Sequence, residues 1–81
     1  QGAYETVEGV CVAIRRAPLG GYQHIRLMDE SGTVMDGVYW GEAKEFAEFA
    51  RSHGTISVTY YPKINSYMGR DSLQIVIQNY C

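Results

Sequence analysis

Basic, amide and aromatic side chains lie close together between residues 63 and 70. Lys63, Asn65, Tyr67 and Arg70 supply two cations, an amide and a phenol ring, and Gly69 permits a tight reversal of the chain. A protein that binds single-stranded nucleic acid needs flat rings on which bases stack, and cations or amides near the phosphates. Because a rigid sheet often presents its binding residues on a loop, this stretch predicts a binding loop at residues 63–69.

Further side chains of the same kinds fall on segments that we expect to be strands or their connections. The candidate nucleic-acid-binding set is Arg15, Arg16, Tyr22, His24, Arg26, Tyr39, Tyr61, Lys63, Asn65, Tyr67 and Arg70. Alternatives stay open, since a tyrosine can pack against the sheet, an arginine can simply be solvated, and Asn65 can form an Asx-turn. Trp40 and Tyr60 are assigned to the core.

No constellation of residues predicts catalysis by this chain alone. His24 and His53 are far apart in the sequence and have no carboxylate or thiol at ligand spacing beside them. Asp29, Glu30 and Asp71 fall at expected turns, where carboxylates usually accept hydrogen bonds from backbone amides. Neither a glycine-rich phosphate loop nor a Ser/His/Asp arrangement can be assembled. We therefore expect no catalytic residue, metal site or cofactor in this chain.

Length and composition predict one small cytoplasmic domain. The 81 residues suffice for a single core, and seven basic against nine acidic residues give a net charge of -2, which does not by itself indicate a nucleic-acid binder. Cys11 and Cys81 are expected to be free thiols. No apolar run approaches the roughly 20 residues of a membrane span. Gln1-Gly2 could be the remnant of a tag.

Apolar periodicity predicts three strands, one helix and two more strands. The expected strands are residues 6–16, 22–28, 34–40, 55–62 and 72–80, and the helix lies between Gly41 and Gly54. The strand residues expected to face the core are Ile25, Leu27, Val38, Trp40, Ile56, Val58, Tyr60, Leu73, Ile75 and Ile77. Asp36 shares the face of Val38 and Trp40, where it needs a partner or water.

This order of elements fits a five-stranded OB-fold over residues 1–81, a partly open Greek-key barrel with one helix between strands three and four. An SH3-like barrel is the alternative, and a full-length helix before the fourth strand disfavours it. In an OB-fold the ligand lies on strands two and three and on the loops that join strands one to two and four to five. Most of the candidate binding residues fall on those elements.

Three stretches of the sequence carry a family likeness. Residues 65–75 read Asn-Ser-Tyr-Met-Gly-Arg-Asp-Ser-Leu-Gln-Ile, residues 22–27 read Tyr-Gln-His-Ile-Arg-Leu, and residues 36–40 read Asp-Gly-Val-Tyr-Trp. Together they resemble the carboxyl-terminal OB domain of the RecJ family of single-stranded-DNA-specific exonucleases. The family often has Trp where this chain has Tyr39 and Tyr67, so weaker stacking is expected.

The resemblance implies that the chain is the carboxyl-terminal binding module of a larger nuclease. That parent would be a RecJ-like 5′–3′ single-stranded-DNA exonuclease, a hydrolase of DNA repair and recombination, whose catalytic domain holds a divalent metal, Mg or Mn. The implied partners are single-stranded DNA and that catalytic domain, with no membrane. Two alternatives remain open: an interdomain or protein–protein docking module that uses the same face, and an RNA-binding OB domain.

Overall fold

Five strands and one helix follow one another in the expected order. The computed structural model describes residues 4–81, so the expectation about Gln1-Gly2 lies outside the described residues. The elements are β1 (Glu5–Arg16), β2 (Gln23–Asp29), β3 (Val34–Tyr39), α1 (Ala43–His53), β4 (Thr55–Tyr67) and β5 (Arg70–Tyr80). The chain is therefore mainly β, as predicted.

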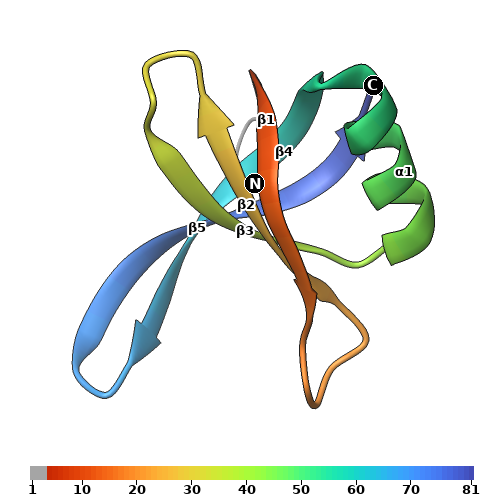
Figure 1. The fold of residues 1–81 in the computed structure, drawn as a ribbon. Helices are drawn as coiled ribbons and strands as arrows, with labels where there is room; N and C mark the ends of the chain where they lie inside the picture. The colour runs from red at the N-terminus through yellow and green to blue at the C-terminus, as the bar shows by residue number, and fades with distance from the viewer. Residues whose placement is uncertain (1–3) are drawn as a thin grey trace.

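The strands close into a barrel in the order β1-β2-β3-β5-β4 (Figure 1). Neighbouring strands are antiparallel except β3 and β5, which run parallel and pair through residues 37–39 and 75–77. β1 closes the barrel because its second half pairs with β2 and its first half with β4. With the helix between β3 and β4, this topology is the OB-fold arrangement, so the predicted fold is confirmed.

Helix α1 contributes aromatic side chains to the core. Phe46 and Ala50 are buried, and the Phe46 ring lies 5.0 Å from that of Tyr39 and 4.8 Å from that of Tyr80, measured between ring centroids. Its apolar residues recur at three and four positions, and it ends at Gly54. Among residues 4–81, no helix is both long enough and apolar enough to cross a bilayer.

An irregularity in β1 breaks the alternation of its side chains. The pairing with β2 shifts register between Cys11 and Ala13, so Val12 is an extra residue in the ladder. Cys11 and Ile14 pack against the core, whereas Val12 is 49% exposed. Regular alternation would place Val12 and Ile14 on one face, and the bulge separates them.

The two faces of β3 are the reverse of the prediction. Val38 and Trp40 point outward, while Gly37 and Tyr39 face the core; Val38 is nevertheless buried, as predicted, at 8% exposed. Gly37 shows why: a Cβ at this position would lie only 2.6 Å from Cγ1 of Ile75, so glycine lets β5 come close to β3 inside the barrel. Trp40 is consequently 63% exposed, and its assignment to the core is wrong.

Most of the other core predictions are confirmed. The buried strand residues include Ile25, Leu27, Ile56, Val58, Ile75 and Ile77, and Tyr60 packs against this cluster. Leu73 is an error, because it is 63% exposed and pairs with Ile64 beyond the barrel.

Strands β4 and β5 project from the barrel as a long hairpin (Figure 1). The predicted loop at residues 63–69 is wrong, since β4 continues to Tyr67, which pairs with Arg70 across a two-residue turn. The turn residues have φ angles of 53° at Met68 and 76° at Gly69. Two positive φ angles in a two-residue connection define a type I′ turn, whose twist matches that of the strands.

Candidate nucleic-acid interface

One row of outward-facing side chains crosses all five strands. Strand pairing sets its members opposite one another in the order Arg15, His24, Val38, Val76 and Tyr61. The next row along β2 contains Ala13, Arg26 and Asp36. Opposed side chains in antiparallel strands have Cβ atoms about 5 Å apart. The sheet itself therefore brings basic, aromatic and apolar groups together.

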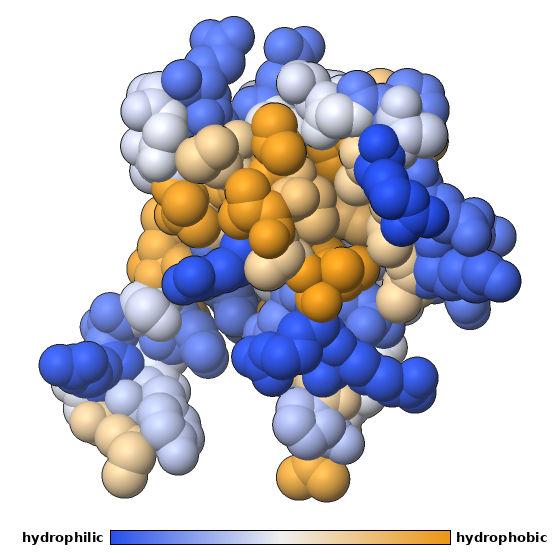
Figure 2. All heavy atoms as spheres, viewed as in Figure 1, coloured by the Kyte–Doolittle hydropathy of each residue, from blue (hydrophilic) through white to orange (hydrophobic). Residues whose placement is uncertain are grey.

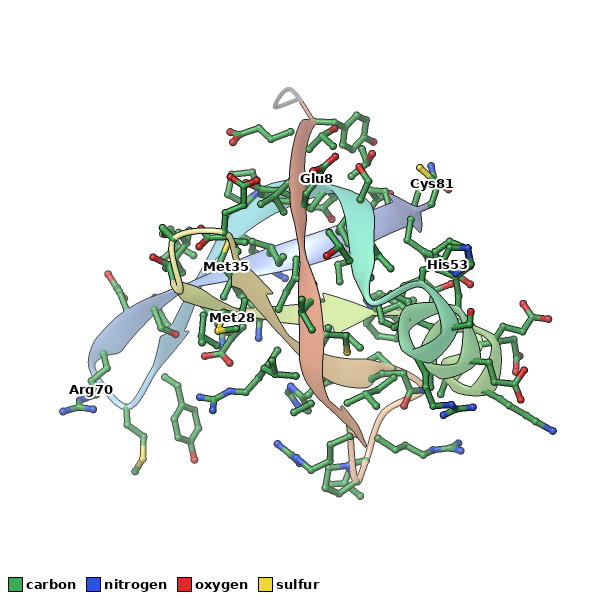
Figure 3. The ribbon with its side chains drawn as sticks, turned by 45° about the horizontal axis from the view of Figure 1, so that its top comes forward. Glu8, Met28, Met35, His53, Arg70 and Cys81 are labelled. Atoms are coloured by element: carbon green, nitrogen blue, oxygen red, sulfur yellow. The ribbon has the colours of Figure 1, made fainter. Side chains whose placement is uncertain are left out.

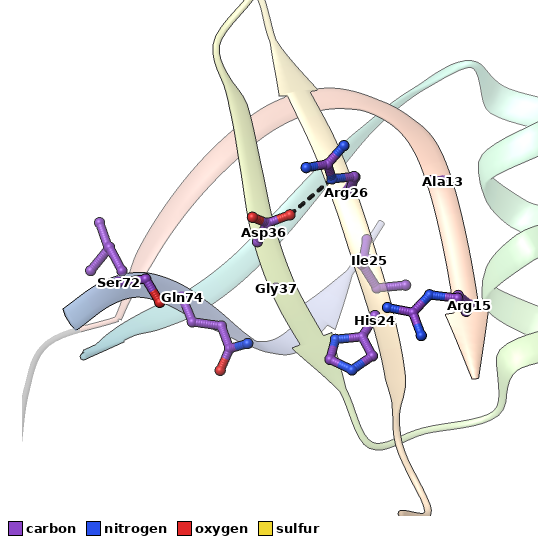
Figure 4. Close-up of a pocket in the computed structure, with 10 residues that line it drawn as sticks. Ala13, Arg15, His24, Ile25, Arg26, Asp36, Gly37, Ser72 and Gln74 are labelled. Carbon is purple, nitrogen blue, oxygen red and sulfur yellow. Dashed lines mark hydrogen bonds and ion pairs between the residues drawn. The ribbon is translucent and has the colours of Figure 1, made fainter. Parts of the chain in front are cut away.

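A first hollow, which we call the basic hollow, lies over the β1–β2–β3 end of these rows (Figure 4). It has a volume of about 480 Å³, and its lining includes Arg15, His24, Arg26, Asp36, Ser72 and Gln74. The side chains of Arg15 and His24 lie on the same side of the sheet in Figure 4. This hollow can accept an anion between strands.

Arg26 and Asp36 form an ion pair inside the basic hollow. The distance from Arg26 Nε to Asp36 Oδ1 is 3.0 Å, and both side chains are 61% exposed. Asp36 thus lies on the outer face, not on the inner face as predicted. An exposed pair of this kind contributes at most about 1 kcal/mol. A phosphate can therefore compete with Asp36 for the guanidinium of Arg26.

A second hollow, the aromatic hollow, adjoins the first. Its walls and rim are Tyr22, Trp40, Tyr61, Lys63 and Asn65, its floor is Val38 and Val76, and it shares His24 and Gln74 with the basic hollow. Its volume is about 270 Å³. Since two residues line both hollows, they form one continuous depression, which we call the groove.

Aromatic side chains at the end of β2 and β3 support one another. The Tyr22 and Trp40 ring centroids are 4.8 Å apart with planes tilted by 42°, and Tyr22 meets His24 edge-on at 5.3 Å. Such contacts hold the rings in place while Trp40 remains 63% exposed. An exposed, supported indole is the kind of platform on which a base stacks.

Charge in the groove is predominantly positive. Arg15, Arg26 and Lys63 line it, and Asp36 is the one acidic residue in its lining among residues 4–81. Within that part of the chain, α1 contributes no residue to either hollow, so its glutamates lie away from the groove. The local field therefore favours an anion despite the net charge of -2.

The structure brings together most of the predicted binding residues. The members that line the groove are Arg15, Tyr22, His24, Arg26, Tyr61, Lys63 and Asn65. Asn65 lies in β4 opposite Ser72, so the alternative in which it forms an Asx-turn does not apply. That motif occurs instead at Asp29, whose Oδ1 accepts hydrogen bonds from the backbone amides of Ser31 and Thr33 at 2.9 and 3.0 Å.

Three predicted binding residues lie outside the groove but remain on the surface. Arg16 pairs with Gln23, and strand alternation puts it on the face opposite Arg15. Tyr67 and Arg70 face each other at the tip of the β4–β5 hairpin, where Tyr67 is 72% exposed. Figure 3 shows Arg70 at this tip, far from the helix.

Tyr39 is placed where it cannot stack on a base at the surface. Its ring packs against Phe46 and Tyr80 in the core, with centroid distances of 5.0 and 5.8 Å. Burial, with a smaller effect of the neighbouring Tyr80, raises the pKa of its phenol. We therefore remove Tyr39 from the candidate binding set, because the reversed faces of β3 turn it inward.

Sequence reasoning missed Trp40, Gln74 and the two valines of the floor. The sequence interpretation places Trp40 in the core, although the small Gly37 on the alternate face is a signal that β3 turns that face toward a close neighbour. Val38 and Val76 face outward, yet they are only 8% and 5% exposed because the side chains of the aromatic hollow cover them.

Among residues 4–81, the other titratable groups do not form a second site. In the stretch from residue 4 to residue 81, no three His, Cys, Asp or Glu side chains are grouped so that they could hold a metal ion. Cys11 is partly buried, which raises its pKa, and Cys81 is exposed; both are free thiols. His53 stacks on Phe49 at 3.8 Å between ring centroids, at the end of α1.

Comparison with known families decides the relationship. A family model described as the RecJ OB domain matches residues 7–79. The chain belongs to the RecJ OB domain family. The match to this RecJ OB domain runs from β1 into the end of β5, and it includes every residue that we place in the groove. Comparisons with curated proteins and with solved structures gave no match.

Proposed function

We propose that this RecJ OB domain binds single-stranded DNA as part of a RecJ-like 5′–3′ single-stranded-DNA exonuclease in DNA repair and recombination. The observation that carries the proposal is the groove, which combines Lys63 and an exposed, supported Trp40 in one hollow with Arg15 and Arg26 in the adjoining one. Cations neutralise phosphates, and the indole and phenol rings stack on unpaired bases.

The groove suits an unpaired strand better than a duplex. Its aromatic platform is useful only to bases whose faces are free, and duplex bases are already stacked on one another. The cations lie on both sides of His24, with Arg15 and Arg26 in one hollow and Lys63 in the other. Phosphates on either side of a stacked base would therefore each meet a positive charge.

The catalytic work of such an enzyme belongs to another domain. The residues of this chain do not fit the Mg or Mn ion that the family's catalytic domain would use, since those described offer no group of three ligand side chains. In this proposal the module holds the strand near the catalytic site and raises its effective concentration there.

Titration of labelled oligothymidine, followed by fluorescence anisotropy at low salt, tests the proposal. Binding should be observed and should weaken as salt rises, because each neutralised phosphate releases counterions. An oligouridine of the same length shows whether RNA is preferred, a choice that 2′-hydroxyl contacts would determine. If the wild-type domain bound neither oligomer, the proposed function would be wrong.

A second candidate function, docking to another domain, is favoured by a separate observation. Val10, Met28 and Val34 lie opposite one another on β1, β2 and β3, and the two valines are 39% and 45% exposed. Figure 2 shows apolar side chains gathered on this face of the molecule, surrounded by hydrophilic ones. Size-exclusion chromatography of the domain mixed with the catalytic fragment tests docking, and Val10→Asp should abolish any complex formed there.

A further inference from the structure

We propose that the aromatic hollow is a pocket for a single nucleobase, whose edge is recognised by the side-chain amides of Asn65 and Gln74. This inference rests on the proposed function and makes it more specific. Single-stranded DNA binding requires only stacking and charge, whereas a base pocket makes the affinity depend on the base at one position of the strand.

The floor and one wall of the hollow match the flat faces of a base. Val38 and Val76 form an apolar floor, and Trp40 stands beside it with its ring supported by Tyr22. Outward-facing valines on a barrel are normally wetted, yet these are 8% and 5% exposed, because the surrounding rings and polar side chains wall them in. Little of either valine is left to bury, so the favourable contact with a base comes from the Trp40 ring, which is 63% exposed beside this floor.

The rim supplies what the polar edge of a base needs. Lys63 lies directly opposite Gln74, and Asn65 is two positions further along β4 on the same face. A side-chain amide presents a donor and an acceptor in one plane, which matches adjacent donor and acceptor atoms on a base edge. Neither amide has a side-chain hydrogen bond to any other residue in the range 4–81, so both are free to make one with a ligand.

The size and surroundings of the aromatic hollow suit one base of a longer strand. Its volume of about 270 Å³ is below the roughly 300–1,000 Å³ typical of pockets for drug-sized ligands. The adjoining basic hollow carries Arg15 and Arg26, and Lys63 is on the rim, so phosphates next to the bound base find cations. A nucleotide within a strand fits this combination better than a neutral apolar molecule.

The chain contains an intrinsic reporter for this pocket. Trp40 is its one tryptophan, so the intrinsic indole fluorescence comes from the wall of the aromatic hollow. The experiment titrates the 81-residue chain with oligothymidine of roughly 16 nucleotides, near the upper site size of an OB-fold, and with a sugar–phosphate oligomer of equal length that lacks bases. Anisotropy of a label on each oligomer measures binding independently of the fluorescence of Trp40.

We expect oligothymidine to quench Trp40 and the abasic oligomer to leave its emission unchanged. The abasic oligomer should also bind about tenfold more weakly or worse, the loss that corresponds to one stacked base. Equal affinity for both oligomers, or oligothymidine binding without any change in Trp40 emission, would overturn the base pocket and leave the proposed function intact. Failure of both oligomers to bind would overturn both.

Amide variants test recognition of the base edge. Asn65→Ala and Gln74→Ala should reduce the differences in affinity among the four homopolymers, while the fluorescence response of Trp40 persists. Asn79→Ala, an exposed amide on β5 outside both hollows, is the matched control and should leave those differences unchanged. Circular dichroism of each variant verifies folding. Folded amide variants that retain the wild-type differences would contradict readout by these residues.

Discussion

At the scale of single residues, the two adjacent arginines of β1 offer an internal comparison. Arg15 lines the basic hollow, whereas Arg16 pairs with Gln23 and points to the other face. The two side chains have the same charge and are neighbours in the chain. Any difference between their variants in DNA binding therefore reports position in the fold and not net charge.

We predict that Arg15→Ala weakens binding of oligothymidine and makes the negative slope of log affinity against log salt shallower by about 0.7, the value for one phosphate on a single strand. Arg16→Ala should leave the slope nearly unchanged, since its charge lies outside the groove. Anisotropy titrations at several salt concentrations measure both slopes. Identical slopes for the two variants would contradict the placement of phosphates along the groove.

Asp29 gives the stability of the β2–β3 hairpin a dependence on pH. Hydrogen bonds from the Ser31 hydroxyl, at 2.7 Å, and from the Thr33 amide hold the pKa of the Asp29 carboxyl below its usual value. Because the pKa is lower in the folded state, the stabilisation is present above the ordinary Asp value near 4. It is lost as the pH falls through the folded-state pKa.

Replacing Asp29 by Asn should therefore flatten the acid limb of the stability profile. The amide oxygen still accepts hydrogen bonds but carries no charge, so Asp29→Asn should lower Tm near neutral pH and change it less below about pH 4. Thermal unfolding followed by circular dichroism over that range measures the effect. A parallel downward shift of Tm at every pH would show that the charge of Asp29 is unimportant.

At the scale of elements, the projecting hairpin contains a residue in an unfavourable backbone conformation. Met68 has a φ of 53°, in the left-handed region that costs a residue with a Cβ about 1–2 kcal/mol. Asn and Gly tolerate this region best, and Asn-Gly is the preferred pair for a type I′ turn. Met68 is also 83% exposed, so its side chain contributes little packing that would offset the strain.

Met68→Asn is expected to raise the free energy of unfolding by up to about 1 kcal/mol, because it relieves the strain at this turn. Chemical denaturation measures the change. Met68→Val is the opposing variant, since a β-branched residue fits positive φ poorly, and it should destabilise the protein. If both variants unfolded at the same denaturant concentration as the parent, the turn geometry would be in doubt.

The hairpin also shows where sequence patterns predict an element and where they do not. Gly69 correctly marks the reversal of the chain, but the polar side chains of Lys63 and Asn65 predict a loop where the structure has the end of β4. Neither side chain needs a buried face, because this part of β4 pairs with β5 outside the barrel. Alternation of apolar residues detects strands that cover a core and misses strands exposed on both faces.

At the scale of the whole molecule, the order of elements predicts the fold, whereas the sequence pattern of β3 does not determine which of its faces is the inner one. Alternation along β3 is compatible with either face being the inner one. The prediction places Trp40 on the inner face, and this hides the main aromatic platform of the groove. The inner face is determined by Ile75, which is distant in the sequence but lies opposite Gly37 in the barrel. Its side chain occupies the space that a Cβ at position 37 would need. Likewise, the bulge at Val12 depends on pairing with β2, which local composition does not determine.

Closure of the barrel depends on the absence of a side chain at Gly37. A Cβ there would lie 2.6 Å from Cγ1 of Ile75 and 3.0 Å from its backbone oxygen. Gly37→Ala should therefore destabilise the protein by about 1–3 kcal/mol, as overpacking of a core does. Gly21→Ala is the matched control, because nothing lies within 4 Å of its Cβ position. Equal denaturation midpoints for the two variants would contradict the close contact of β3 with β5.

The parallel ladder between β3 and β5 spans three residue pairs, the shortest seam in the barrel. The groove lies across that seam. Strands β1, β2 and β3 form one side of it, and β4 and β5 form the other. Loss of the β3–β5 pairing would separate the two sides of the groove and release a ligand bound between them. A nucleic-acid strand bound in the groove would contact both sides and so stabilise the β3–β5 pairing. Hydrogen exchange at the backbone amides of Val38 and Val76 should therefore be slower while that ligand is bound.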